Sequence, residues 1–225
     1  MSKKMILLLR VLILLGLIAF AFFVAWHYGL LQHIIVTDRS YLSSVIFIIY
    51  IALSVHWLYV AVRLSLESDS VDLLGHNSQG PWPDKPDEQG NLVKDLTSQL
   101  HKDLTPNQVT GLLDLFADQV SNRHSIGYFV SDVLLRLGLL GTIIGFILML
   151  LPVSEIQEFD SSAMQRLLAS MSGGMAVALY TTLTGLITST LLRFQYHILE
   201  SAAAIMVYRI SLIVRSRFES SKNAT

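Results

Sequence analysis

Two threonines lie near the middle of two long apolar runs, and their hydroxyl groups are the polar chemistry that these runs offer. Thr142 belongs to LRLGLLGTIIGFILML, and Thr182 belongs to GGMAVALYTTLTGLITSTLL. A hydroxyl can relay a proton or coordinate Na⁺ as a neutral oxygen, but it carries no ionisable charge. The two runs therefore predict a polar path for a small cation, with Thr142 and Thr182 at its centre.

Small residues recur beside both threonines at helical spacing. We expect two polar stripes to line one path, and their members are Gly138, Thr142, Gly145 and Met149 in the first run and Ala178, Thr182, Gly185 and Ser189 in the second. Thr181, Thr184 and Thr188 form an adjacent stripe that either widens the polar surface or meets a neighbouring subunit. The pair Gly141-x-x-x-Gly145 is also typical of tight helix packing, with threonines bonded to preceding carbonyls. Both interpretations stay open at this point.

Charged residues are absent from the centres of both runs. Asp132 and Arg136 lie four residues apart near one end of the first run, where they either pair with each other or form a polar exit for ions. Intramembrane ion coupling usually uses an ionisable side chain, and neither run has a central carboxylate. The charge is therefore expected from another chain.

Other kinds of chemistry find little support. The chain has no cysteine, and its seven histidines include no pair at i,i+3 or i,i+4, so we expect neither a metal site nor a cofactor. No nucleophile-elbow, Walker or dinucleotide-binding pattern occurs, so we expect no enzyme. The formal net charge of −1 offers no basic field for nucleic acid.

The elements that must position the threonines are membrane helices. Of the 225 residues, 52% are hydrophobic and 15% are charged, whereas soluble domains average about 25% charged residues. Four apolar runs are long enough to span a bilayer, at 5–26, 41–62, 128–151 and 171–192. The sequence predicts an all-α membrane protein with four transmembrane helices. A fifth span at 198–214 is a weaker alternative, because it is short and would bury Glu200 and Arg209.

The distribution of Lys and Arg predicts the orientation of the chain. With the N-terminus inside and four crossings, Arg39 and Arg166 are the basic residues in the outer loops, at 27–40 and 152–170, and the other 14 of the 16 lie on the cytoplasmic side. We therefore expect both termini to be cytoplasmic.

Four segments follow from these spans. We expect a peripheral hairpin at 1–63, a cytoplasmic segment at 64–127, the threonine hairpin at 128–193 and a cytoplasmic helix at 194–225. Within the second segment, Gly and Pro predict a loop at 75–90, helical spacing predicts a helix at 92–104, and Thr105-Pro106 predicts the start of another. The helix at 194–225 is expected to pack against the helices of 92–120.

Two motifs resemble the MotA/TolQ/ExbB proton channel family. The run from Gly138 to Gly145, GLLGTIIG, is similar to the family signature G-L-x-G-T-x-x-G, and the run from Ala176 to Leu186, AVALYTTLTGL, is similar to its A-x-A-L-x-x-T-x-x-G-L helix. The resemblance covers about 128–195. Many ExbB and TolQ members have a glutamate where this chain has Val177. Four spans resemble MotA, and the paired threonines resemble the sodium-driven PomA type.

The resemblance implies an assembly and a partner. It implies a homopentamer in the bacterial inner membrane, whose last two spans surround two copies of a single-span MotB/TolR/ExbD-like protein. The partner's membrane aspartate would bind the ion. By position, Thr142 and Thr182 would be the ion-path threonines, and Ala178 and Gly185 would give clearance for the partner helix, with Gly138 and Gly145 lining the same path.

The function expected from this sequence is that of an ion-conducting subunit of a motor driven by H⁺ or Na⁺. A non-transporting membrane scaffold or sensor that recruits a cytoplasmic protein is the second possibility. A small transporter with its own substrate site is a third, weakened by the lack of a charged or aromatic pocket. The process that receives the work, whether flagellar rotation, outer-membrane transport, gliding or defence, is not specified by the sequence.

Overall fold

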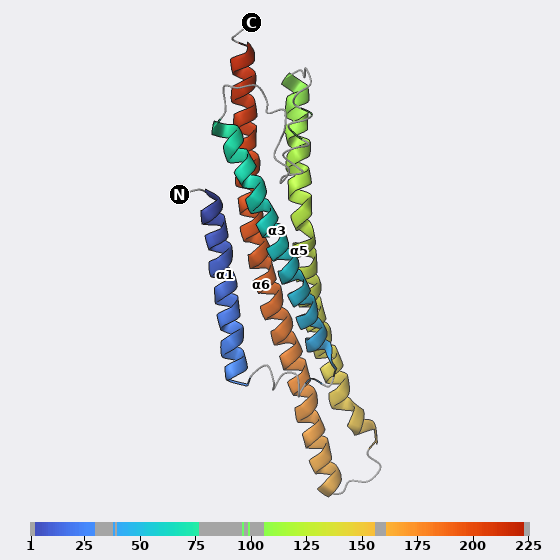
Figure 1. Ribbon diagram of the computed structural model, residues 1–225. Coiled ribbons are helices and arrows are strands. Elements are labelled where there is room, and N and C mark those ends of the chain that lie inside the picture. The colour runs from blue at the N-terminus through green and yellow to red at the C-terminus, as the bar shows by residue number, and fades with distance from the viewer. Residues whose placement is uncertain are drawn as a thin grey trace. The chain divides into compact units, whose positions relative to one another are not determined.

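Nearly all of the residues that the structure describes are helical. A computed structural model describes residues 3–29, 38, 40–76, 96, 99, 106–155 and 161–222. The helices are α1 (Lys3–His27), α3 (Leu42–His76), α5 (Pro106–Leu150) and α6 (Ser161–Lys222), with a short 3₁₀ helix, η1 (Leu151–Glu155), after α5 (Figure 1). Four of these helices are long and apolar enough to cross a membrane. The prediction of an all-α chain with four helices long and apolar enough to span a membrane is confirmed.

Two of the helices are much longer than a bilayer requires. α5 has 45 residues and α6 has 62, which correspond to about 68 Å and 93 Å at 1.5 Å per residue, whereas the hydrocarbon core is about 30 Å thick. α5 begins at Pro106, as the Thr105-Pro106 pair predicted, and continues without a break to Leu150. Residues 198–214 lie inside the unbroken α6. A fifth span would require a reversal of chain direction before residue 198, so that alternative is wrong.

Two helices extend beyond the membrane spans predicted within them. α3 continues to His76, past the predicted span at 41–62, and α6 begins at Ser161, ten residues before the predicted span at 171–192. Hydropathy marks only the part of a helix that suits hydrocarbon, whereas helix formers such as Met164 and Leu167 extend the helix past it. The predicted outer loop at 152–170 is shortened accordingly. The first two residues of the loop predicted at 75–90, Gly75 and His76, belong to α3. The rest of that loop and most of the helix predicted at 92–104 lie outside the described residues.

The chain divides into two compact units. The first consists of Met1–Leu14, Trp57–Ile126 and Tyr196–Thr225. Helices α3, α5 and α6 each supply buried side chains to it at spacings of mostly three or four residues. These residues are Trp57, Ala61, Leu64 and Val71 of α3, Val109, Leu113, Phe116 and Val120 of α5, and Leu199, Ala203, Met206, Ile210 and Val214 of α6.

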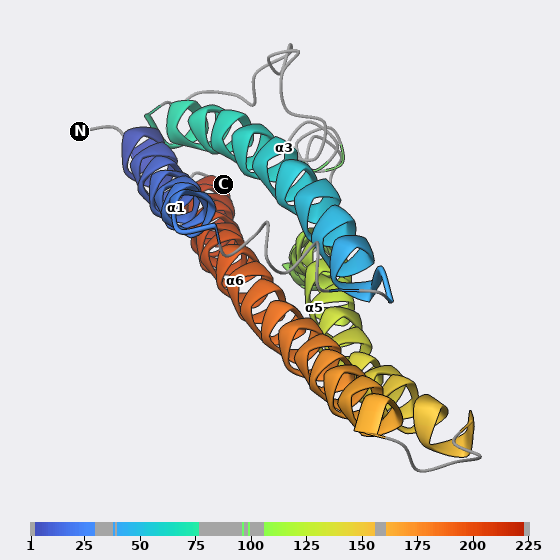
Figure 2. The same ribbon diagram turned by 90° about the horizontal axis from the view of Figure 1, so that it is seen from below.

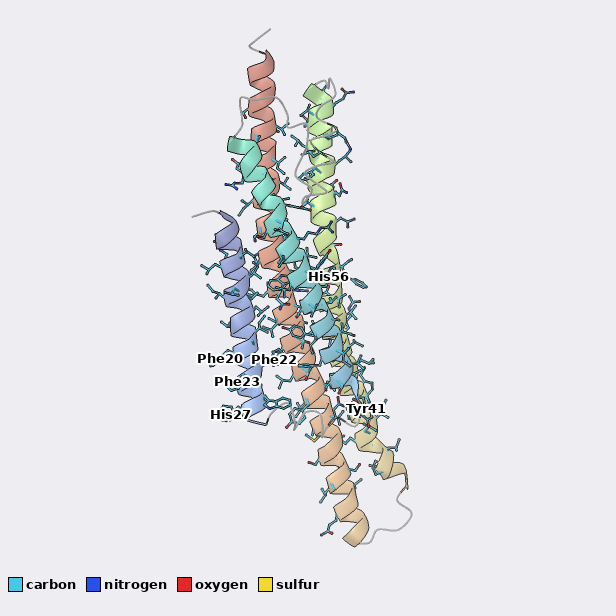
Figure 3. The ribbon with its side chains drawn as sticks, in the orientation of Figure 1. Phe20, Phe22, Phe23, His27, Tyr41 and His56 are labelled. Atoms are coloured by element: carbon cyan, nitrogen blue, oxygen red, sulfur yellow. The ribbon has the colours of Figure 1, made fainter. Side chains whose placement is uncertain are left out.

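The second unit consists of Leu15–His56 and Gly127–Gln195. In it, α1 contacts α3 through aromatic rings. Phe22 lies edge-on to Phe47, with ring centroids 5.2 Å apart, and 6.0 Å from the ring of Tyr50 (Figure 3). α3 also contacts α6, because the Ser54 hydroxyl donates to the Gln195 side-chain oxygen at 3.2 Å. The segments of α5 and α6 in this unit run side by side, as the yellow and orange ribbons show (Figures 1 and 2).

The start of α3 is fixed by an aspartate. The buried Asp38 carboxylate accepts hydrogen bonds from the backbone N–H groups of Ser40 at 2.9 Å and Ser43 at 2.7 Å. Burial raises the pKa of the Asp38 carboxyl, but the hydrogen bonds from Ser40 and Ser43 outweigh burial and leave the pKa below its ordinary value of 3.8. Because Ser43 lies in the first turn of α3, Asp38 satisfies a donor that the helix itself cannot.

Candidate functional site

α5 and α6 touch at the level of their backbones. A Cβ atom placed on Gly185 would lie 2.7 Å from the Cα atom of Gly138 and 2.9 Å from the carbonyl oxygen of Leu134. A Cβ atom on Gly138 would lie 3.0 Å from the Cα atom of Gly185. Approach this close is possible only without side chains, so glycine is required on both helices at this crossing.

One and two turns further along α5, two more glycines meet α6. A Cβ atom on Gly141 would lie 2.2 Å from the hydroxyl oxygen of Thr181, whose side chain is fully buried. A Cβ atom on Gly145 would lie 2.7 Å from the backbone nitrogen of Ala178 and 2.7 Å from the carbonyl oxygen of Gly174. The buried positions follow each other every three or four residues on both helices, which is the spacing of a left-handed helix pair.

The four small residues predicted to line a path all belong to this seam between α5 and α6. Gly138, Gly145 and Gly185 are buried, and Ala178 is half-buried. Their contacts agree with the tight-packing interpretation within one chain. A contact of these residues with a partner helix stays a prediction.

The two central threonines lie at the border of the seam and are half-buried. The Thr182 hydroxyl lies within hydrogen-bonding distance of two carbonyl oxygens, Ala178 on its own helix at 3.0 Å and Gly138 on α5 at 3.2 Å. The Thr142 hydroxyl donates to the carbonyl oxygen of Leu139 at 2.6 Å. The structure thus brings Thr182 onto the α5 backbone, whereas Thr142 bonds within its own helix.

The third predicted path residue, Thr181, differs from these two. Its side chain has 0% exposure, and its hydroxyl contacts the carbonyl oxygens of Val177 at 2.9 Å and Ala178 at 3.1 Å. The side chain occupies the space that the missing Cβ of Gly141 leaves. The Thr181 side chain therefore packs α6 against α5.

The other threonine hydroxyls of α6 also bond backbone carbonyls. Thr184 donates to Tyr180 at 2.8 Å and Thr188 donates to Thr184 at 2.7 Å. A hydroxyl has one hydrogen and two lone pairs, so a hydroxyl whose hydrogen is donated can still accept a hydrogen bond or coordinate a cation. On the half-buried Thr142 and Thr182, the chemistry that remains is that of a neutral oxygen ligand.

The charged pair near the start of the apolar segment of α5 is not the one expected between Asp132 and Arg136. Asp132 forms an ion pair and a hydrogen bond with Arg193 of α6, and not with Arg136. The reason is geometric, because the guanidinium of Arg193 on α6 lies beside Asp132 on α5. Residue spacing along one helix cannot predict a contact between two helices. Both side chains are about half exposed, so the pair is worth about 0–1 kcal/mol. Arg136 is exposed.

Sequence reasoning missed two residues of this site. Gly174 was not singled out, although it lies four residues before Ala178 and a Cβ atom there would be 2.7 Å from the carbonyl oxygen of Gly145. Arg193 was counted only among the 14 Lys and Arg residues expected on the cytoplasmic side. The periodicity of small residues could have identified Gly174, but nothing in the sequence identified the pairing of Arg193. Within the described residues, no group of three or more His, Asp or Glu side chains is placed to hold a metal ion.

The comparison with known proteins agrees with the resemblance. The sequence model of the MotA/TolQ/ExbB proton channel family matches residues 90–211, more than half of the 225 residues. No curated protein and no solved structure matches the chain. The chain therefore belongs to the MotA/TolQ/ExbB proton channel family, a family of channel-type membrane proteins, and the α5–α6 site lies inside the matched region.

Proposed function

We propose that this protein is the ion-conducting subunit of a motor in the bacterial inner membrane, driven by H⁺ or Na⁺ flow. Five copies would surround two copies of a single-span partner that carries the ion-binding aspartate. Family membership supports this proposal. The observation that carries it is the α5–α6 pair, where half-buried threonine oxygens border a glycine seam in two apolar segments without a central carboxylate.

The proposed ion path runs along Thr142 and Thr182. Their hydroxyl oxygens keep free lone pairs, so they can coordinate Na⁺ or accept a hydrogen bond from a hydrated proton as the ion approaches the partner's carboxylate. Gly138, Gly145, Ala178 and Gly185 keep α5 and α6 close enough to present both threonines on one surface. The ion pair between Asp132 and Arg193 would lie at the inner end of this path.

The driving force is sufficient for small mechanical steps. An elementary charge that moves down 100 mV releases about 2.3 kcal/mol. The proposed orientation has both termini in the cytoplasm, because 14 of the 16 Lys and Arg residues then lie on that side. The long inner parts of α5 and α6 would extend the bundle into the cytoplasm. The chain itself would catalyse no covalent reaction.

The first test replaces both path hydroxyls. Thr142→Val with Thr182→Val is nearly isosteric, so we expect the assembly to persist while ion-dependent flux into vesicles containing chain and partner falls by at least about tenfold, a barrier change of about 1.4 kcal/mol. The measurement is made in Na⁺ and in K⁺ buffer at the same membrane potential. Flux that persists without Na⁺ identifies H⁺ as the ion.

Thr190→Val is the matched control for this test. Thr190 is exposed on α6 and donates only to the carbonyl oxygen of Leu186, at 2.8 Å. The same chemical change at this position should leave flux unchanged. Full flux in the double variant would contradict the proposed path.

A second function is favoured by one observation. Six threonine hydroxyls of α5 and α6 hydrogen-bond to backbone carbonyls, which is also what a packing role requires; they belong to Thr142, Thr181, Thr182, Thr184, Thr188 and Thr190. The alternative is a non-transporting scaffold or sensor that recruits a cytoplasmic protein. Native mass spectrometry of the purified chain, alone and co-expressed with a single-span protein of the MotB/TolR/ExbD type, separates the two. We expect five copies, with two copies of the partner added. A monomer, dimer or tetramer in both preparations would favour the scaffold.

A further inference from the structure

An arginine lies inside the apolar segment of α5. Arg136 is exposed, and no hydrogen bond or ion pair joins it to another residue in the part of the chain that the structure describes. The ion pair of Asp132 with Arg193 lies one turn closer to the start of α5, and the uncharged part of α6 ends directly before Arg193, at Leu192. Arg136 is therefore one turn deeper in the apolar segment than the charges that mark its end.

The sequences of α5 and α6 offer Arg136 no second carboxylate. Asp132 is the only acidic residue at 119–154, and none occurs at 161–199. Asp132 already accepts a hydrogen bond from Arg193, so the charges of these three side chains sum to +1. A guanidinium in an apolar membrane segment is costly unless it meets an anion or reaches the lipid headgroups.

Both arginine side chains lie beside Asp132. Arg136 and Asp132 are four residues apart and share a face of α5, and Arg193 contacts Asp132 from α6. The two helices run antiparallel, as their glycine contacts show. Because helical side chains lean toward the N-terminus of their own helix, Arg136 leans toward the level of Asp132, and Arg193 leans back toward that of Arg136. The two guanidinium groups therefore approach one level of the membrane.

The face of α5 beyond Arg136 is apolar. Leu139, Leu140 and Ile143 follow Arg136 at three, four and seven residues, and each is about half exposed. A basic pair that is followed by such a stripe matches an amphiphile in which a phosphate is joined to an acyl chain. This face is separate from the proposed ion path, because Arg136 and Thr142 are six residues apart and thus about 120° apart around the helix.

We propose that Arg136 and Arg193 bind the phosphate group of an anionic membrane lipid, at the end of the apolar segments of α5 and α6. A guanidinium donates in a planar fork that fits two phosphate oxygens, and Arg193 keeps donors beyond the one that Asp132 receives. A lipid phosphodiester carries one negative charge, so it brings the charge of the group to zero. A free phosphate ion would use the same guanidinium groups but not the apolar stripe. The proposed orientation places the lipid in the inner leaflet, and the site does not depend on ion conduction.

Native mass spectrometry of the full chain tests the site. The protein is reconstituted in vesicles of equimolar phosphatidylglycerol and phosphatidylcholine and extracted in mild detergent, and the lipids of each kind that stay bound are counted. We expect phosphatidylglycerol to exceed phosphatidylcholine. Arg136→Gln should lower the ratio of the two by about tenfold, as loss of a charge-assisted hydrogen bond does.

Arg10→Gln is the matched control. Arg10 is an exposed arginine in the apolar helix α1, so its substitution removes the same charge. That charge acts on lipids through the field of the membrane surface, which salt screens, and the ratio should change by about twofold or less.

Three results would overturn the proposal. One is an unchanged ratio in Arg136→Gln, and another is an equal fall in Arg10→Gln, which would indicate a general attraction of positive charge for anionic lipid. The third is release of phosphatidylglycerol by added inorganic phosphate, which would identify a site for a free anion.

Asp132→Asn serves if Arg136→Gln does not fold. It removes the carboxylate that repels the phosphate, so more phosphatidylglycerol should stay bound, whereas unchanged or lower retention contradicts the site. The same spectra report the copy number of the chain. A failure of the proposed assembly is therefore seen separately from a failure of the lipid site.

Discussion

Two of the helix contacts within the second unit differ in the groups that form them. α1 meets α3 through large rings, with the centroids of Phe22 and Phe47 5.2 Å apart. α5 meets α6 through glycine backbones, where an added Cβ would fall within 3.0 Å of the other helix at Gly141, Gly145 and Gly185. Lipid is as apolar as a side chain, so association of membrane helices depends on packing and hydrogen bonds.

This difference indicates which helix contacts tolerate added side-chain volume. A ring contact leaves side chains that can rotate and readjust, and α1 keeps large exposed side chains such as Phe20 and Phe23 (Figure 3). A contact between glycine backbones has no side chain that could rotate to make room for added atoms. We therefore expect the α5–α6 seam to be the part of the molecule most sensitive to added volume, and α1 to be far more permissive.

The largest effect is expected at Gly145. Gly145→Ala places a methyl group 2.7 Å from the backbone nitrogen of Ala178 and from the carbonyl oxygen of Gly174, and overpacking of this kind costs about 3 kcal/mol. The measurement is the thermal unfolding midpoint of the detergent-purified protein. Gly16→Ala in α1 is the matched control, because no atom lies within 4 Å of the added Cβ. It should stabilise slightly, by about 0.5–1 kcal/mol. Equal effects at the two sites would contradict the comparison.

A smaller loss of stability is expected at Gly141, and a second substitution should recover part of it. The atoms nearest to an added Cβ there all belong to the Thr181 side chain, at 2.2, 2.4 and 3.0 Å. Gly141→Ala should destabilise by about 2 kcal/mol, and adding Thr181→Gly should recover about 1 kcal/mol relative to the sum of the single changes.

A second pair of substitutions, Gly145→Ala with Ala178→Gly, tests the difference between side-chain and backbone contacts. Adding Ala178→Gly to Gly145→Ala removes a Cβ but leaves the Gly174 oxygen and the Ala178 nitrogen in place. This combination should recover nothing. A similar recovery in both pairs, measured by unfolding midpoints, would show that the Gly145 contact also readjusts.

The smallest effect concerns the start of α3 and depends on pH. The folded-state pKa of Asp38 lies below its ordinary value of 3.8. The stabilisation is therefore fully present above about pH 4 and is lost as the pH falls through the folded pKa. Asp38→Asn should cost about 1 kcal/mol at neutral pH, as loss of a helix cap does, and should reduce the loss of stability on acidification.

The pH dependence of the unfolding midpoint checks this expectation. Asp114→Asn on α5 is the control, because Asp114 is an exposed aspartate. It should follow the wild-type curve. A wild-type curve in Asp38→Asn would mean that the carboxylate adds nothing to the folded state.

Much of the fold could be predicted because long-range order along a membrane helix follows from local composition. Four apolar runs gave four helices, and Thr105-Pro106 gave the start of α5. The full lengths of α3 and α6 were not predicted, because hydropathy marks the part of a helix that suits the hydrocarbon core while the helix continues beyond it. The threonines of the site were identified by type and position, but the partners of their hydroxyls were not.

The sequence by itself determined the membrane architecture, the family motifs and the absence of a central carboxylate in the threonine hairpin, because each of these is a property of composition or spacing along one segment. The tertiary structure decided the rest. In it, Thr181 packs against Gly141, the Thr182 hydroxyl lies within hydrogen-bonding distance of the Gly138 carbonyl oxygen, and Asp132 forms an ion pair with Arg193. Each of these contacts joins residues 40 or more positions apart on two helices, and their relative rotation and depth depend on which surfaces pack most closely.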